Sequence, residues 1–84
     1  MHSDEIFYKK SAAKELLDFD KKLQAKIKEQ IEKELRKKGP VGKKLQGEFA
    51  GLYRIDVAKY RVVYALRTEG KLILRIRHRK EVYR

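Results

Sequence analysis

Apolar side chains in the first half of this chain recur every four residues, at Leu23, Ile27, Ile31 and Leu35. This spacing predicts a helix from Lys21 to about Lys38 with one buried stripe. Asp20 stands where an N-cap is expected. Gly39 and Pro40 predict the end of the helix, because glycine takes the left-handed cap conformation and proline cannot continue a helix.

Two shorter elements precede this helix. Ile6-Phe7-Tyr8 is an apolar run of strand length. Ser11 is expected to cap a helix from Ala12 to Asp18, with Leu16 and Leu17 on its inner face. The two helices are therefore expected to form an antiparallel hairpin after a short N-terminal strand.

After residue 40 the hydrophobic period changes to two, which is the period of a β-strand. In each of three successive segments, every second residue is apolar, and these residues are expected to share one face of the sheet. They are Tyr53, Ile55, Val57, Tyr60, Val62, Tyr64, Leu66, Leu72, Leu74 and Ile76. Glu69-Gly70 fits a hairpin turn between the last two strands. Ala58-Lys59 fits one poorly because neither residue favours positive φ, so that connection is expected to be bulged.

These elements predict an α+β fold in one small domain, residues 1–84, with the order β-α-α-β-β-β. A chain of this length can build only one compact core. The helical hairpin is expected to cover one face of a mainly antiparallel sheet, and the other face is expected to be open.

Charge is the strongest compositional signal. Lys and Arg outnumber Asp and Glu by 23 to 12, for a formal net charge of +11, and most of the excess lies after residue 52. Such a chain attracts nucleic acid, an anionic membrane surface or an acidic protein. The chain has no cysteine, no signal-peptide pattern and no apolar run long enough to span a membrane, so a cytoplasmic location is expected.

The outward parity of the predicted sheet gathers five arginines: Arg54, Arg61, Arg67, Arg75 and Arg77. A single arginine there would be an ordinary solvated side chain. Five of them, opposed only by Asp56 on that parity, would destabilise a sheet unless an anion were bound. The planar guanidinium suits phosphate, because it donates two parallel hydrogen bonds.

Two further residues could handle protons. His78 has the parity of the apolar positions, so it is either a buried or edge histidine or a proton carrier. Tyr83 is a core aromatic, a base-stacking platform or a proton donor. The acidic residues show no metal-ligand spacing, and no phosphate-binding glycine motif is present, so no metal or cofactor is expected. RNA cleavage is compatible with this, because the substrate supplies its own 2′-hydroxyl nucleophile.

Four motifs in order resemble the RelE/ParE toxin superfamily, and RelE in particular. They are Lys44-Leu45-Gln46-Gly47, Gly51-Leu52-Tyr53-Arg54-Ile55, Tyr60-Arg61-Val62-Val63-Tyr64 and His78-Arg79-Lys80-Glu81-Val82-Tyr83-Arg84. The resemblance covers essentially the whole chain. It implies a toxin of a type II toxin–antitoxin module that cuts mRNA on the ribosome and inhibits translation. It also implies an acidic, RelB-like antitoxin as partner.

The resemblance also assigns residues. Arg61 and Arg79 correspond to the two arginines that stabilise the phosphate, Tyr83 to the tail tyrosine, and Arg54 to the basic residue after the Gly-Leu-Tyr motif. With His78 as a possible proton carrier, these form the expected catalytic set. The cations expected to bind RNA and the ribosome are Lys43, Lys44, Lys59, Arg75, Arg77, Lys80 and Arg84.

Two departures from the pattern leave alternatives open. Asp56 stands where ribonuclease members often carry a second basic residue, so it either acts as a general base or pairs with Arg54. Ala58-Lys59 replaces the usual Gly-Asp. The alternatives are a ParE-like inhibitor of DNA gyrase, which does not cleave RNA, and a basic nucleic-acid-binding module without catalysis.

Overall fold

The computed structural model describes residues 5–37, 39–78 and 80. The elements are β1 (Ile6–Tyr8), α1 (Lys10–Leu17), α2 (Lys21–Leu35), β2 (Lys43–Lys44), the 3-10 turn η1 (Gly47–Phe49), β3 (Leu52–Val57), β4 (Tyr60–Arg67) and β5 (Gly70–His78). The predicted α+β order is confirmed. The two-residue strand β2 was not predicted, because two adjacent lysines carry no periodic signal.

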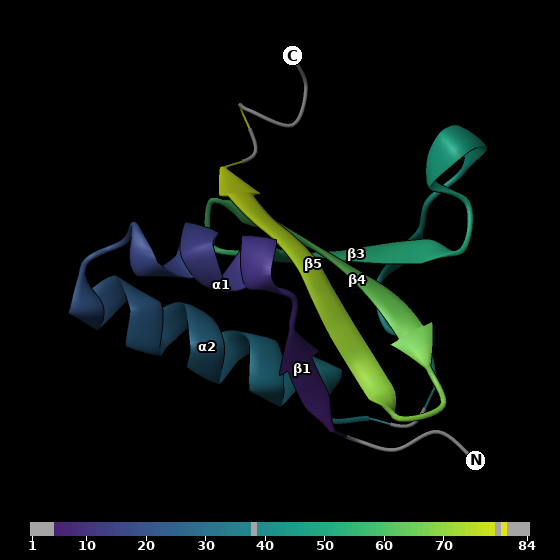
Figure 1. The fold of residues 1–84 in the computed structure, drawn as a ribbon, viewed down its shortest axis with the longest axis horizontal. Helices are drawn as coiled ribbons and strands as arrows, with labels where there is room; N and C mark the ends of the chain where they lie inside the picture. The colour runs from purple at the N-terminus through teal and green to yellow at the C-terminus, as the bar shows by residue number, and fades with distance from the viewer. Residues whose placement is uncertain (1–4, 38, 79, 81–84) are drawn as a thin grey trace.

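The five strands form one sheet in the order β1-β5-β4-β3-β2. Only the β1–β5 pair is parallel among the described strands, and the other pairs are antiparallel. Helices α1 and α2 lie side by side against one face of this sheet (Figure 1). We call the opposite face the open face.

The core lies between α2 and the middle of the sheet, as the hydrophobic pattern predicts. Ile27, Ile31 and Leu35 of α2 are at most 1% exposed, and they pack with sheet residues such as Val62 and Ile76. Tyr53 and Tyr60 are partly buried against this core, and Tyr64 is fully buried. The inward parity expected for β3 and β4 is confirmed.

The two helix caps differ in outcome. Asp20 caps α2, because its carboxylate accepts a hydrogen bond from the Leu23 amide at 2.8 Å. The prediction that Ser11 caps α1 is wrong. The helix begins at Lys10, two residues earlier than predicted, and the Ser11 hydroxyl donates instead to the Leu74 carbonyl of β5 at 3.1 Å.

A β-bulge in β5 overturns part of the predicted parity. Val63 of β4 lies opposite Arg75, but the next residue, Tyr64, lies opposite Ile73. Leu74 is therefore an extra residue without a partner on β4. A bulge of this kind reverses the alternation of side chains along the strand that contains it.

The reversal changes which residues of β5 face the helices. Leu72 and Leu74 were expected to point inward, and this is wrong: both are half-buried, whereas Ile73 is fully buried and Lys71 is only 1% exposed. Ile76, which lies after the bulge, keeps its predicted inward position. Sequence alternation alone gives no sign of the bulge, because both parities of β5 are apolar in this segment.

The hairpin turns also differ from expectation. Val57 pairs directly with Tyr60, so the β3–β4 connection is a tight two-residue turn rather than a bulge, and Ala58 adopts a φ of 55° to make it. The β4–β5 turn lies one residue earlier than predicted, at Thr68 and Glu69. Gly70 then begins β5 with a φ of 143°, and a Cβ atom there would lie 2.2 Å from the Glu5 carbonyl oxygen.

Lys71 ties the far end of α2 to the sheet. Its ammonium group is buried and donates to the Leu35 carbonyl at 2.9 Å and to the Lys37 carbonyl at 2.5 Å. Carbonyls at a helix C-terminus lack partners within the helix and carry partial negative charge, so a buried cation stabilises them. The helix ends at Leu35, beside this contact, rather than at the predicted Lys38, which lies outside the described residues.

We expect Lys71→Met to lower the free energy of unfolding by about 2–3 kcal/mol, because methionine fills the space but cannot donate to the carbonyls. The midpoint of thermal unfolding should then fall by roughly 10–20 °C. Lys26→Met, at an exposed position of α2, is the control and should shift the midpoint little. Equal melting of both variants would show that the contact does not hold the helix end.

Candidate functional site

The open face carries the outward-pointing arginines of three strands. Asp56, Arg61 and Arg77 lie opposite one another across β3, β4 and β5. One row further along, Arg54 lies opposite Val63, which lies opposite Arg75. Arg67 lies on the same parity near the other end of β4. We call Arg54, Arg61, Arg75 and Arg77, with Asp56, the arginine cluster.

Arg61 is the most buried member of this cluster. The residue is 6% exposed, and its Nε donates to Oδ1 of Asp56 at 3.2 Å. The Asp56 side chain is 44% exposed, so its carboxylate reaches solvent while it holds the guanidinium. The sequence left open whether Asp56 pairs with Arg54, and the structure pairs it with Arg61.

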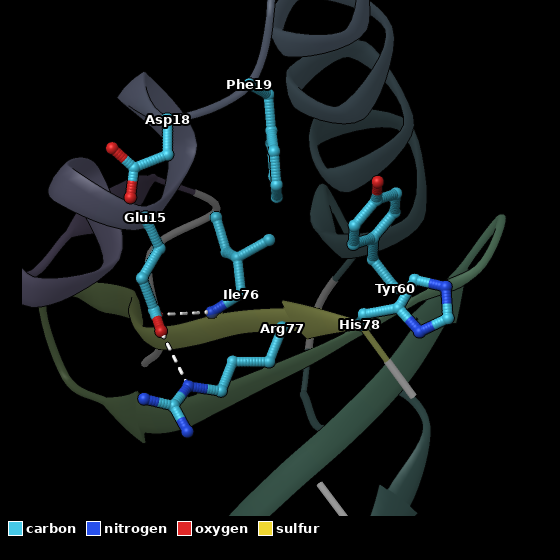
Figure 2. A pocket seen from close by; sticks show the side chains of 7 residues that line it. All are labelled: Glu15, Asp18, Phe19, Tyr60, Ile76, Arg77 and His78. Atoms are coloured by element: carbon cyan, nitrogen blue, oxygen red, sulfur yellow. Dashed lines mark hydrogen bonds and ion pairs between the residues drawn. The ribbon is translucent and has the colours of Figure 1, made fainter. Parts of the chain in front are cut away.

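A second carboxylate reaches the cluster from α1. Glu15 accepts hydrogen bonds from Arg75 Nη2 at 3.1 Å, from Arg77 Nε at 2.8 Å and from the backbone amide of Ile76 at 2.9 Å. Figure 2 shows its carboxylate between the Ile76 amide and the Arg77 guanidinium. The sequence suggested that only Asp56 opposes these arginines. The structure shows that Glu15 opposes them as well.

The environment of Glu15 has two opposed effects on its pKa. Partial burial alone would raise the pKa of the carboxyl. The hydrogen bonds from Arg75, Arg77 and the Ile76 amide favour the charged form and outweigh the burial, so the pKa lies below its ordinary value of 4.5. Glu15 is thus a carboxylate at neutral pH and holds both guanidinium groups in place.

Lys43 and Lys44 form the exposed edge strand β2, and Lys43 lies opposite Arg54. The preceding loop is held by Tyr64, whose buried hydroxyl donates to the Val41 carbonyl and accepts from the Val41 amide. Burial raises the pKa of this phenol above its ordinary value of 10.0, which keeps its proton available for the contact. This contact places the two lysines beside the arginine cluster.

His78 lies on the other side of the sheet from Arg61. It pairs with Tyr60 at the end of β5, and their rings meet edge to face at 5.6 Å, on the helical side (Figure 2). The His78 Nδ1 accepts a hydrogen bond from the Lys80 amide at 3.2 Å, which leaves its proton on Nε2 in the neutral form. The sheet therefore separates His78 from Arg61, with which it was expected to form one catalytic set.

The remaining predicted site residues fall into two groups. Lys59, in the β3–β4 turn, and Lys80 are exposed. Arg79, Tyr83 and Arg84 lie outside the described residues. Within the described ranges no group of three or more potential metal-ligating side chains occurs, and no helix is both long and apolar enough to cross a membrane.

Sequence reasoning missed Glu15 because its contacts span some sixty residues and no local pattern announces them. One signal was available: Glu15 is four residues after Ser11 and therefore on the same face of α1. Since Ser11 also bonds to β5, these two residues mark the side of α1 that meets the strand.

The fold and the arginine cluster define a small, basic α+β protein, and comparisons with known proteins show the class to which it belongs. The family model of the ParE toxin of type II toxin–antitoxin systems (parDE) matches residues 6–83. The chain belongs to this family, within the RelE/ParE superfamily. No curated protein matches the chain significantly.

Three solved structures are similar. The toxin–antitoxin complex RelBE2 from Mycobacterium tuberculosis has 25% identity and a TM-score of 0.79, with 94% of each chain covered. A YoeB/ParE toxin from Agrobacterium tumefaciens has 19% identity and a TM-score of 0.65, covering 88% of this chain and 96% of that one, and shows the fold alone. A conserved hypothetical protein from Helicobacter pylori has 25% identity and a TM-score of 0.58, with 98% and 99% covered.

The depressed pKa of Glu15 predicts a pH dependence of stability. A carboxyl with a lower pKa in the folded state contributes stability above its unfolded pKa, and that contribution is lost as the pH falls through the folded pKa. We expect Glu15→Gln to cost about 1–2 kcal/mol at pH 7, and the difference from the original protein should shrink below about pH 4.5.

Urea unfolding at pH 7 and at pH 3 measures this difference. Glu29→Gln, which removes an exposed carboxylate of α2, is the control. Its difference in free energy of unfolding from the original protein should not shrink in the same way at low pH. If Glu15→Gln lowers the free energy of unfolding by the same amount at both pH values, the negative charge of Glu15 does not stabilise the fold.

Proposed function

We propose that this toxin is a ribosome-dependent endoribonuclease that cuts mRNA in the cytoplasm and so inhibits translation. The observation that carries the proposal is the placement of Arg61: a nearly buried guanidinium that Asp56 holds in a cationic row of the sheet, opposite Arg77. A rigid cation of this kind can stabilise the charge that builds up on a phosphate during cleavage.

The chemistry requires little beyond this. The 2′-hydroxyl of the RNA attacks the neighbouring phosphorus, and the bond to the 5′-oxygen breaks. One proton leaves the 2′-oxygen and one reaches the 5′-oxygen. We assign the phosphate to Arg61, with Arg79 as the second cation that the resemblance implies. Arg54, beside Lys43, would orient the flanking backbone.

The proton carriers must reach the open face. Asp56 does, because its partly exposed carboxylate lies against Arg61. Tyr83 is the second candidate, on the resemblance alone. His78 is the weaker candidate, because the sheet separates it from Arg61. We therefore propose Asp56 as general base and Tyr83 as the group that protonates the leaving oxygen.

One observation favours a second candidate function. The contact with Asp56 partly neutralises Arg61, and a neutralised cation binds phosphate less strongly. This, with the match to the ParE family model, supports inhibition of DNA gyrase without RNA cleavage.

We further propose that an acidic antitoxin binds the chain. The net charge of +11 favours an acidic partner. The open face also offers apolar contact, because Phe7 is 42% exposed and lies opposite Leu72 beside Arg67. A partly disordered chain could neutralise the arginines and cover this apolar end together.

We expect Arg61→Ala to lower the rate of mRNA cleavage by about a hundredfold or more, because one preorganised charge donor is lost. The measurement is sequencing of RNA ends in a translation reaction that contains ribosomes. Arg67→Ala, on the same face near the far end of β4, is the matched control and should cut almost normally. Both variants must first show circular dichroism spectra like that of the original protein.

Codon-phased cuts that persist in Arg61→Ala would overturn the assignment of the phosphate. If the original protein makes no cuts but inhibits DNA gyrase in a supercoiling reaction, the second candidate function is correct.

Asp56→Asn separates the two roles of Asp56. If Asp56 is the general base, the substitution should reduce the cleavage rate at least a hundredfold, because asparagine cannot accept a proton at neutral pH. If the carboxylate only holds Arg61, cleavage should be unchanged or faster, since asparagine can still accept the hydrogen bond while the cation is no longer neutralised. Single-turnover rates between pH 5 and 8 distinguish these results.

A further inference from the structure

A cavity lies behind the arginine cluster, on the helical side of the sheet. It has a volume of about 890 Å³ and is lined by Glu15, Asp18, Phe19, Tyr60, Ile76, Arg77 and His78. Cavities of this size commonly hold small molecules or parts of larger ligands. We call it the ring pocket, because three aromatic rings line it (Figure 2).

The three rings form a continuous aromatic wall. Phe19 and Tyr60 have ring centroids 4.8 Å apart with an interplanar angle of 51°, and Tyr60 meets His78 edge to face at 5.6 Å. All three are half-buried, so each presents part of its surface to the cavity. Surfaces of this kind bind the planar bases of single-stranded RNA by stacking.

The wall is held by the fold. Tyr60 begins β4 and His78 ends β5, and the register of the two strands pairs them. Phe19 lies in the break between α1 and α2, where its amide donates to the Leu16 carbonyl at 3.2 Å and its carbonyl accepts from Gln24 Nε2 at 2.6 Å. A prearranged wall loses little conformational freedom when a base stacks on it.

The polar groups of the ring pocket indicate what the ligand carries. The Asp18 carboxylate is exposed at its rim and makes no hydrogen bond to another described residue. Carboxylates only accept hydrogen bonds, so any group that binds to Asp18 must donate them. Among bases, guanine presents neighbouring N–H donors on one edge, from its ring N1–H and its amino group, and these suit a carboxylate. A phosphate placed beside Asp18 would be repelled by this carboxylate.

Arg77 joins the ring pocket to the arginine cluster. It lies opposite Arg61 on the open face, and it also lines the cavity. An RNA strand whose phosphate contacts Arg77 could therefore place a neighbouring base in the ring pocket. This role for His78 is stacking rather than proton transfer, and it uses the position on the helical side that the structure gives it.

We propose that the ring pocket binds one RNA base next to the phosphate held by the arginine cluster, with guanine preferred. The proposal rests on the proposed RNA-cleaving function, which it deepens by assigning a base specificity. It predicts that the rings determine which base is bound, whereas the arginines determine how strongly the backbone is bound.

The test uses guanosine 5′-monophosphate as probe, with ribose 5-phosphate as the matching compound without a base. We expect Phe19→Leu to weaken binding of the nucleotide about fivefold to a hundredfold, which corresponds to loss of one stacking contact of roughly 1–3 kcal/mol. Binding of ribose 5-phosphate should not change. Phe49→Leu, which alters an exposed phenylalanine in η1 far from the cavity along the sheet, is the control and should bind both compounds normally.

A second substitution tests the edge contact. Asp18→Asn should reduce the preference for guanosine over adenosine monophosphate, because an asparagine side chain presents only one acceptor to the two guanine donors. Titration calorimetry at fixed salt measures both preferences. Equal nucleotide binding by Phe19→Leu and the original protein, or equal affinity for the nucleotide and ribose 5-phosphate, would overturn the proposal.

The outcomes separate this proposal from the proposed function. If the protein binds guanosine monophosphate through Phe19 but never cuts mRNA, the proposal for the ring pocket stands and the proposed nuclease function is wrong. If the original protein and Phe19→Leu cut mRNA equally at every codon, the proposal for the ring pocket is wrong and the proposed nuclease function stands. If Phe19→Leu instead weakens only binding of the acidic antitoxin, the cavity is a protein-docking site and the proposal is wrong.

Discussion

Leu74, the extra residue in β5, determines what each face of the sheet presents. Before the bulge Ile73 and the buried Lys71 face the helices, and after it Ile76 does. Without the bulge, one of these two sets would have to face the open side. Lys71 could then not reach the end of α2, or Arg75 and Arg77 would face the core, where unpaired charges are costly. The core and the arginine cluster therefore depend on the same local irregularity.

The outer edge of β5 has no described strand partner beyond Ile73, since β1 pairs only with residues 71–73. Helix α1 supplies what is missing, because Ser11 bonds to the Leu74 carbonyl and Glu15 to the Ile76 amide. Unpaired strand edges invite association with other chains, so this cover has a structural purpose. The same Glu15 carboxylate holds two arginines, which makes the geometry of the site depend on the packing of α1.

The parts of the structure that the sequence predicts are those with a strong local period. The stripe of α2 and the alternation of β3 and β4 give correct elements and correct faces. The parity of β5 is misread because residues 72–74 are apolar on both sides, so alternation cannot locate an inserted residue. The partners of Asp56 and Lys71, and the side of the sheet on which His78 lies, depend on register between strands. A single sequence does not contain that information locally.

Arg61 and Asp56 show how the sheet tolerates a face of this kind. Adjacent guanidinium groups repel one another, and the repulsion would weaken the strand pairs that carry them. Asp56 and Glu15 offset part of this repulsion. A phosphate and an acidic side chain of a partner can each replace these internal carboxylates only by offering more or better-placed acceptors. If the chain binds both RNA and an acidic antitoxin, as we propose, the two would compete for the same guanidinium groups, and inhibition by the antitoxin would require no change in the fold of the sheet.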